Sequence, residues 1–303
     1  MYNYTAPPTA EPLPLKDLLR RLNISLTLRR KLKRTAGAIQ VNGQAAAWQT
    51  VVRPGDTVSI VWPEECRIIP LAMPLDVVFE DESLLVADKP AGLLAHPTTD
   101  PARPSLANAV IGYLRARGLS CGFHPVHRLD RNTSGLILIA KNPHIHHLFS
   151  RPGGINIERT YLAIVDGIPA PPAGTIRAPI GRYPDSIIQR MVRADGQEAV
   201  TCYETVERLG SGSLVRLRLQ TGRTHQIRVH LAHIGHPIFG DDLYGGSTAC
   251  ISRQALHAAR LTFLHPLSGE ALDLTSCLPP DMSGLLARLR SGKSQDFPQF
   301  VIP

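Results

Sequence analysis

The sequence predicts an α+β fold, and two patterns in its 303 residues carry this prediction. Apolar runs typical of strands come in pairs joined by short turns, as in residues 75–90 and 198–220, which are expected to form hairpins. Segments with the helical spacing of apolar residues lie between such runs. Strands paired by hairpins favour this class over a doubly wound parallel sheet, in which strands and helices alternate regularly.

The N-terminal part of the chain has the pattern of a small α+β module over residues 15–63. A Pro- and Thr-rich N-terminus, residues 1–14, precedes it and is expected to be flexible. Leucines at helical spacing in LKDLLRRL predict a first helix, and Ser25 is a suitable N-cap for a second helix that ends near Gly37. The dipeptide Asn42-Gly43 then predicts a hairpin.

The second predicted helix of this module carries a concentrated positive charge. Its basic residues are Arg29, Arg30, Lys31, Lys33 and Arg34. The whole chain has a formal net charge of +8 and a pI near 9.5, which suits a polyanionic partner but is also common in proteins that bind no nucleic acid. Because the charge is gathered on one short helix, a nucleic-acid contact is expected there.

A proline-bearing linker at residues 64–74 separates this module from a strand-rich domain at 75–291. Helices are expected at 106–117 and 280–291, and residues 292–303 are expected to form a C-terminal tail. Within the domain, buried strands are predicted for SGLILIAK and RTYLAIVDG, a helix for RTHQIRVHLAHIG, and a further strand for QALHAARLTFLHP.

The composition excludes several classes of protein. The five cysteines are scattered without a CxxC pair, so neither a zinc ribbon nor a disulfide framework is expected. A hydrophobic fraction of 43% is sufficient for a packed core. No apolar segment reaches membrane-spanning length, and MYNYTAPPTAEPLP lacks the apolar region of a signal peptide. A cytoplasmic location without a membrane partner is therefore expected.

One aspartate stands out in the stretch HPVHRLDRNTSGLILIA, residues 124–140. Asp130 is the only carboxylate there, lies between Arg128 and Arg131, and precedes an apolar run that should be buried. A nearby cation favours the ionised carboxylate, which can act as a nucleophile or as a base. The alternative is a loop aspartate that forms a salt bridge or caps the following turn, and for an isolated RLD triplet this alternative is the more common one.

A second group of polar residues lies in the stretch 219–246. Arginines and histidines gather at the start of its predicted helix, where backbone N–H groups favour anions: Arg223, His225, Arg228, His230 and His233. His230, His233 and His236 have a spacing that could suggest a metal site, but steps of three rotate around a helix and the arginines oppose a bound cation. The adjacent Asp241 and Asp242 are more typical of a turn. No metal site is therefore expected.

Two further segments have a structural and a functional interpretation. Tyr161 lies in a predicted strand, where tyrosine usually packs, and a functional role would require its ring to face the same cleft as Asp130. HIHH, residues 144–147, is expected to be the solvated face of a helix.

Together, these segments resemble the RluA-type pseudouridine synthases, enzymes that isomerise uridine in RNA. The signature is carried by HRLDRNTSGLILIAK, and the match continues in the family's order with DKPAGLLAHP, ERTYLAIVDG, TGRTHQIRVHLAHIGHPIFGD and LHAARLTFLHP. It covers roughly residues 71–290. Asn132 departs from the pattern, because many relatives carry aspartate there. The N-terminal module is similar to the small S-four-type RNA-binding domain shared with a small-subunit ribosomal protein.

The resemblance implies a pseudouridine synthase catalytic domain with a mixed, mainly antiparallel sheet, flanking helices and a central RNA-binding cleft. It implies that Asp130 is the catalytic carboxylate, which attacks the ribose C1′ or takes the 2′ proton. Tyr161 would stack on the flipped base and help to remove the C5 proton, Arg223 would pair with Asp130, and Arg128 would help to extrude the uridine. Further RNA contacts are expected from His127, Arg131, Arg228 and the basic residues of the N-terminal helix.

The expected partner is RNA, and neither a metal nor an organic cofactor is implied. Ribosomal RNA is favoured because an N-terminal RNA-binding module suits a large structured target, while transfer RNA remains an alternative. A non-catalytic RNA-binding protein and a metal hydrolase built on the 225–242 segment are the competing interpretations. A monomer is expected.

Overall fold

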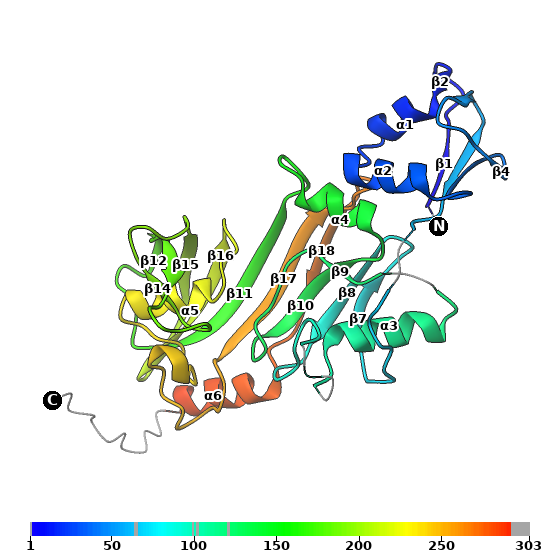
Figure 1. The fold of residues 1–303 in the computed structure, drawn as a ribbon. Coiled ribbons are helices and arrows are strands. Elements are labelled where there is room, and N and C mark those ends of the chain that lie inside the picture. Colours follow the sequence, from blue (N-terminus) through cyan, green and yellow to red (C-terminus); the bar gives the residue numbers. More distant parts are fainter. Residues whose placement is uncertain (1, 64–65, 99, 101–102, 120–121, 292–303) are drawn as a thin grey trace.

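The computed structural model describes residues 2–63, 66–98, 100, 103–119 and 122–291. The C-terminal tail expected at 292–303 lies outside these residues. A small N-terminal part stands at one end of a long twisted sheet, and helices lie against that sheet (Figure 1). The α+β class predicted from the sequence is confirmed by this mixed architecture.

The N-terminal part is built from two short helices and a four-stranded sheet in the order β1-β6-β3-β4, with a separate pair of strands, β2 and β5. Its elements are β1 (Tyr2–Thr5), β2 (Leu13–Pro14), α1 (Leu15–Arg21), α2 (Leu26–Arg34), β3 (Ile39–Val41), β4 (Gln44–Ala45), β5 (Val51–Val52) and β6 (Thr57–Ile60). The expectation of a flexible N-terminus is wrong for residues 2–5, because β1 forms an antiparallel ladder with β6. That ladder pairs one edge of β1 and fixes its position.

The local signals of this part have the predicted effect. The Ser25 hydroxyl accepts a hydrogen bond from the Leu28 N–H at 3.2 Å, as an N-cap should. Asn42 and Gly43 both have positive φ, 51° and 78°, which is the backbone conformation of a type I′ hairpin turn. The predicted hairpin is therefore present between β3 and β4.

The second part contains a ten-stranded sheet whose main path runs β12-β15-β16-β11-β17-β10-β8-β7. β18 pairs with β17 and β9 with β10, and β10 with β17 is the parallel pair. The elements are β7 (Asp76–Glu80), β8 (Leu84–Lys89), α3 (Leu106–Ala116), β9 (His124–Pro125), β10 (Ser134–Ala140), α4 (Pro143–Ser150), β11 (Ile157–Asp166), β12 (Ala173–Arg177), β13 (Ile180–Arg182), β14 (Arg190–Val192), β15 (Val200–Leu209), β16 (Gly212–Leu219), α5 (Gln226–His233), η1 (Asp242–Tyr244), β17 (Leu256–Leu264), β18 (Ala271–Thr275) and α6 (Pro280–Arg290).

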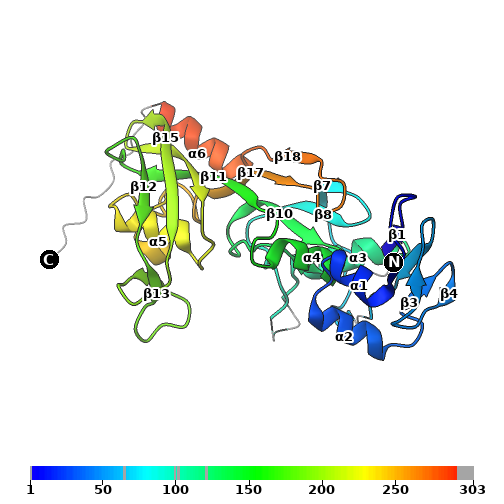
Figure 2. The same cartoon turned by 90° about the horizontal axis from the view of Figure 1, so that it is seen from above.

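Strand β10 is buried on both faces, which explains its continuous apolar sequence. Alternate side chains of a strand point to opposite faces of the sheet. Accordingly, Ile137 and Ile139 join a core that includes α3 and α6, whereas Leu136 and Leu138 join a second core that includes α4. Figure 2 shows α3 and α4 as separate helices near β8 and β10. The central sheet is therefore a rigid platform for the loop that precedes β10.

Gly135 brings this loop close to strand β17. Its φ is +108°, and a Cβ atom at this position would lie 2.3 Å from the backbone oxygen of Ala258. Only glycine fits both the backbone conformation and the close approach. The parallel pairing of Ser134–Gly135 with His257–Ala258 therefore fixes the position of the preceding Asp130 loop.

The two parts contact each other through α4 and β1. His144 is 1% exposed, and its ring contacts the rings of Tyr2 and Trp62, with centroids 5.4 Å away in each case. The expectation that residues 144–147 form a solvated helix face is therefore wrong for His144, because the N-terminal part covers it. Arg151 donates to the Asn23 side chain across the same contact at 2.7 Å.

The described part of the expected linker is packed on α3. The Leu71 N–H donates to the Asn108 carbonyl, and the Asn108 side chain donates to the Ile69 carbonyl. A Cβ atom on Gly112 would lie 2.1 Å from the Leu71 carbonyl oxygen, so the linker and the helix touch at backbone level. The linker is thus held against α3 of the second part at Ile69 and Leu71.

Candidate active site

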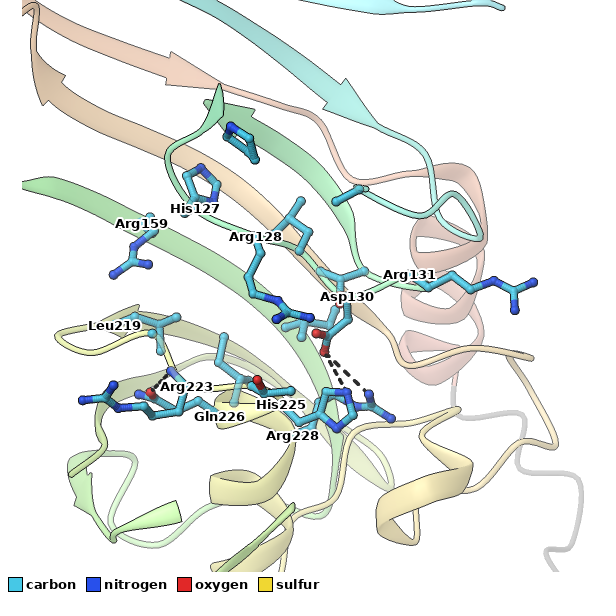
Figure 3. A pocket seen from close by; sticks show the side chains of 18 of the residues that line it. His127, Arg128, Asp130, Arg131, Arg159, Leu219, Arg223, His225, Gln226 and Arg228 are labelled. Carbon is cyan, nitrogen blue, oxygen red and sulfur yellow. Dashed lines mark hydrogen bonds and ion pairs between the residues drawn. The ribbon is translucent and has the colours of Figure 1, made fainter. Parts of the chain in front are cut away.

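A pocket of about 750 Å³ lies between the segment after β8, the loop before β10, strand β11 and the start of α5. Asp130 lies inside it, and Figure 3 shows its carboxylate facing the start of α5. The pocket also contains Tyr161, Arg128 and Arg223 among its lining residues. Residues far apart in the sequence, which were proposed from motifs, are therefore brought to one cavity.

The carboxylate of Asp130 faces two nitrogen groups of α5 and its N-cap. Its Oδ2 lies 3.6 Å from the Arg228 guanidinium and 3.8 Å from His225 Nε2. Arg228 is 6% exposed, and it also donates two hydrogen bonds of 2.7 Å to the fully buried carboxylate of Asp241. Asp241 thereby holds the guanidinium in place, and the shared cation favours the ionised form of Asp130.

The prediction that Arg223 pairs with Asp130 is wrong. Its Nε donates to the Glu198 carbonyl at 2.9 Å, and Figure 3 shows the side chain extending away from Asp130. The physical reason is the position of the helix start. Arg223 precedes α5 in a loop held by the Gln226 side chain, whereas Arg228 lies inside the helix on the face toward Asp130. The sequence stretch contains both arginines, and only the helix start distinguishes them.

Arg228 was expected to contact RNA, and its buried side chain is instead an internal partner of two carboxylates. Asp241, expected to be a turn residue, is the second residue of this ion pair. Burial lowers the pKa of Arg228, but the hydrogen bonds and charge of Asp241 outweigh this effect, so the pKa is raised overall. The guanidinium is therefore a permanent cation beside Asp130.

His225, which lines the pocket, is held in place by Tyr244. His225 Nδ1 and the Tyr244 hydroxyl are 2.9 Å apart, and the hydroxyl oxygen accepts a 3.0 Å hydrogen bond from the Arg190 N–H. His225 has a left-handed backbone conformation, φ 57°, at the N-cap of α5, and this conformation is uncommon for a residue other than glycine. Burial, and then the charge of Arg228, lower the pKa of His225 against the opposing effect of Asp130.

Tyr161 meets the geometric condition that a functional role requires. It comes from β11, is 4% exposed and lines the same pocket as Asp130. Burial, with the nearby charge of Asp130 acting in the same direction, raises the pKa of Tyr161 to about 12. The ring therefore presents a neutral phenol to the pocket at neutral pH.

Lys89 is a buried residue near the site that sequence reasoning missed. It is fully buried, and its Nζ donates to the carbonyls of Pro90, Leu93 and Arg131 at 2.8, 2.9 and 3.0 Å. Burial lowers its pKa to about 7, against the attraction of Asp130. Three carbonyl acceptors match the three protons of an ammonium group. The Lys89 side chain thus ties the segment after β8 to the Asp130 loop, and its place in the DKP motif was the available signal.

The loop residues that flank Asp130 differ in accessibility. Arg128 is exposed at the pocket, and Arg131 is exposed but donates to the Gly92 carbonyl at 3.1 Å. His127 accepts a hydrogen bond from the Leu138 N–H through Nε2, and its Nδ1 is buried. Burial lowers the pKa of His127 to about 3. The expected RNA contact by His127 is therefore corrected to a structural role, because neither ring nitrogen is accessible.

The remaining histidines of α5 do not form a metal site. His230 is fully buried and bonded to Thr201 and to the Ala178 carbonyl, at 2.8 and 2.9 Å. Across residues 2–63, 66–98, 100, 103–119 and 122–291, no group of three or more His, Cys, Asp or Glu side chains is arranged to hold a metal ion. In the same part of the chain, no helix is long and apolar enough to cross a membrane.

Comparison with known proteins gives the family. Residues 83–233 match the family described as RNA pseudouridylate synthase. The uncharacterized RNA pseudouridine synthase YjbO of Bacillus subtilis (strain 168) is 40% identical over 279 residues, which cover 90% of this chain and 98% of that protein. The chain belongs to the RNA pseudouridylate synthase family. The resemblance to RluA-type enzymes is thereby confirmed, and the protein is an isomerase that acts on RNA.

Further relatives of this RNA pseudouridine synthase have more specific names. A protein named ribosomal large subunit pseudouridine synthase D, from Xanthomonas campestris pv. campestris, is 37% identical over 86% of this chain and 83% of its own length. Among solved structures, human RNA pseudouridylate synthase domain containing 4 has a TM-score of 0.57 and 27% identity, covering 71% of this chain and 93% of that one. The catalytic fold expected from the resemblance is confirmed by this likeness.

Proposed function

We propose that this RNA pseudouridine synthase modifies ribosomal RNA and that Asp130 is its catalytic carboxylate. The observation that carries the assignment is an aspartate inside a pocket, held against a buried arginine that is itself fixed by Asp241. The relative from Xanthomonas campestris is named as a ribosomal enzyme, which supports this class of RNA. Transfer RNA is the alternative substrate.

The reaction is an isomerisation, so all its atoms remain in the nucleotide. The bond between uracil N1 and ribose C1′ breaks, the base rotates, a bond forms between C5 and C1′, and the C5 proton leaves while N1 gains one. Asp130 would either attack C1′ or take the 2′ proton to start this sequence. Tyr161, as a neutral ring in the same pocket, would stack on the uracil and help to remove the C5 proton.

Arg228 would take the role that the resemblance implied for Arg223. As a fixed cation 3.6 Å from Asp130, it would keep the carboxylate charged and oriented while the RNA phosphates approach. The exposed Arg128 at the pocket would help to extrude the uridine and take its place in the RNA. Extrusion costs a few kcal/mol and least where the base is already unpaired.

The N-terminal part, residues 15–63, would act as an S-four-type RNA-binding domain joined by the 64–74 linker to the catalytic domain at 75–291. Four basic residues of α2 are exposed: Arg30, Lys31, Lys33 and Arg34. Arg29 is half-buried and donates to the Ile24 carbonyl, so it would contribute less. Phosphate contacts from such a helix release counterions and strengthen binding at low salt.

The test uses a strain in which the chromosomal gene is deleted and a plasmid supplies either the wild-type gene or a variant. Pseudouridine is then mapped in ribosomal and transfer RNA from each strain. The wild-type copy should restore a modification that the deletion removes, whereas Asp130→Asn should leave the site unmodified although the protein folds. Asp76→Asn, at an exposed carboxylate of β7, is the control and should restore it. Restoration by Asp130→Asn would remove Asp130 from the mechanism. A lost site in transfer RNA would overturn the ribosomal assignment.

A further inference from the structure

A second pocket of about 330 Å³ adjoins the candidate active site. It lies between the β13–β14 hairpin and the loop 195–197, and it shares Arg223 and Thr224 with the larger pocket. The two pockets are therefore neighbours, and Arg223 lies where they meet. Its Nε bond to the Glu198 carbonyl holds the guanidinium there rather than at Asp130.

Positive charge dominates the lining of this second pocket. Its charged residues are Arg182, Arg190, Arg223 and a single carboxylate, Asp195. That carboxylate is paired with Arg193 through two hydrogen bonds of 2.5 and 2.7 Å, so its charge is neutralised locally. The three arginines remain as the net charge, which suits a phosphate rather than a cation or a neutral group.

The hairpin that bears two of these arginines is anchored to the catalytic part. The Arg190 N–H donates to the Tyr244 hydroxyl, and the Gln189 side chain donates to the Leu243 carbonyl at 3.2 Å. Ile180 packs against Val229 of α5 in a small core. The pocket thus has a defined position relative to Asp130, because Tyr244 also contacts His225.

The turn of the same hairpin exposes apolar and aromatic side chains. Ile187 is 83% exposed, Ile188 is 61% exposed and Tyr183 is 45% exposed. Exposed rings and apolar groups beside a cationic groove are typical of surfaces that bind single-stranded nucleic acid, where bases stack and arginines follow the backbone. An extruded uridine leaves its neighbours without a stacking partner on one side, and such a surface can bind them.

We propose that this second pocket binds the phosphodiester and nucleotide next to the target uridine in the RNA strand. Arg182 and Arg223 would contact the phosphate, and the 183–188 turn would contact the adjoining base. The proposal rests on the proposed function, because it takes RNA as the substrate. It also gives Arg223 a role that its separation from Asp130 leaves open.

The experiment uses the full-length enzyme and ribosomal RNA from the deletion strain, labelled with tritium at uracil C5, so that isomerisation releases tritium. Arg182→Ala and Arg223→Ala should each raise KM about tenfold, with a much smaller change in kcat. The slope of log affinity against log salt should fall by about one for each lost phosphate contact. Arg177→Ala is the matched control, since Arg177 is an exposed arginine of β12 outside the pocket.

Filter binding of the same RNA separates this proposal from the proposed function. If the wild-type enzyme releases no tritium from any RNA of the strain, the proposed function fails, and the pocket is judged by binding alone. Weaker binding and a smaller salt slope in the two pocket variants, but not in Arg177→Ala, support the pocket. Wild-type affinity and salt slope in both pocket variants overturn it.

Discussion

The side chain of His225, which faces Asp130, is held by the hydroxyl group of Tyr244. The Tyr244 hydroxyl oxygen accepts from the Arg190 N–H, and its own proton can be donated to His225 Nδ1, 2.9 Å away. A neutral histidine that accepts at Nδ1 carries its proton on Nε2, the nitrogen that faces Asp130 at 3.8 Å. With Tyr244 as the donor, the Asp130 carboxylate would lie between a guanidinium and an N–H group, both held by residues outside its own loop.

Replacing Tyr244 with phenylalanine should slow the reaction more than it weakens RNA binding. The variant keeps the ring against Arg228 but removes the hydroxyl group that contacts His225 Nδ1 and, as the donor, would set the tautomer of His225. We expect kcat to fall about tenfold, the effect of one lost hydrogen bond of roughly 1.4 kcal/mol in the transition state, with little change in KM. Tritium release measures both constants.

Tyr203→Phe is the control for this variant, because the Tyr203 hydroxyl donates to the Pro171 carbonyl and does not line the pocket. His225→Gln should retain more activity than His225→Ala, since an amide can still donate toward Asp130. Equal kcat values for Tyr244→Phe, Tyr203→Phe and the wild-type enzyme would contradict the role of the tautomer.

Strand β10 connects the Asp130 loop to the core, and its second residue allows a direct test. Gly135→Ala should destabilise the catalytic part by at least ~2 kcal/mol, because the new methyl group meets the Ala258 backbone in a positive-φ conformation. Urea denaturation followed by fluorescence measures the loss. Gly153→Ala also has positive φ but no atom within 4 Å of the added Cβ, so it should cost only about 1 kcal/mol. Equal losses would show that the contact with β17 is unimportant.

Helix α2 makes a separate prediction about salt. Replacing its exposed basic residues, Arg30, Lys31, Lys33 and Arg34, by glutamine should raise the KM for ribosomal RNA. The salt slope of binding should become shallower by up to about 0.9 for each phosphate contact that is lost. Arg115 and Arg288 are exposed arginines of α3 and α6. A variant in which both are replaced by glutamine is the comparison for the α2 variant. An unchanged slope in the α2 variant would indicate that this helix does not contact the RNA.

The contact between the two parts of the molecule contains a buried neutral histidine and should therefore weaken in acid. Burial, with smaller effects from His147 and Arg151, lowers the pKa of His144 to about 4. Its unfolded pKa is about 6.5, so between these values the unfolded chain binds the proton and the folded chain does not. Stability contributed by the neutral ring is complete above pH 6.5 and is lost as the pH falls toward 4.

His144→Phe should remove this dependence while keeping an aromatic contact with Tyr2 and Trp62. Between pH 7 and pH 5, the free energy of unfolding of the wild-type protein should fall by about 2 kcal/mol more than that of the variant. Other buried histidines, such as His127, contribute equally to both proteins and cancel in the difference. If the free energy of unfolding fell by the same amount in the wild-type protein and in His144→Phe between pH 7 and pH 5, His144 would not be a buried neutral histidine.

Local features of this protein could be predicted from the sequence because they depend on neighbouring residues. The N-cap at Ser25, the turn at Asn42-Gly43 and the hairpin of β15 and β16 follow from short-range backbone preferences, and all are present. The choice of Asp130 and Tyr161 for one site followed from motif order. Their common pocket agrees with that choice.

The remaining features required the tertiary structure, because their partners are distant in the chain. Residues 2–5 form a strand only through β6, and His144 is buried only by Tyr2 and Trp62. Whether Arg223 or Arg228 faces Asp130 depends on the start of α5 and on its packing against Asp241. The sequence alone thus determined the family, the class of fold and the choice of the Asp130 loop as the candidate site. The packing of helices and domains decided which cation accompanies Asp130, since only long-range contacts set that orientation.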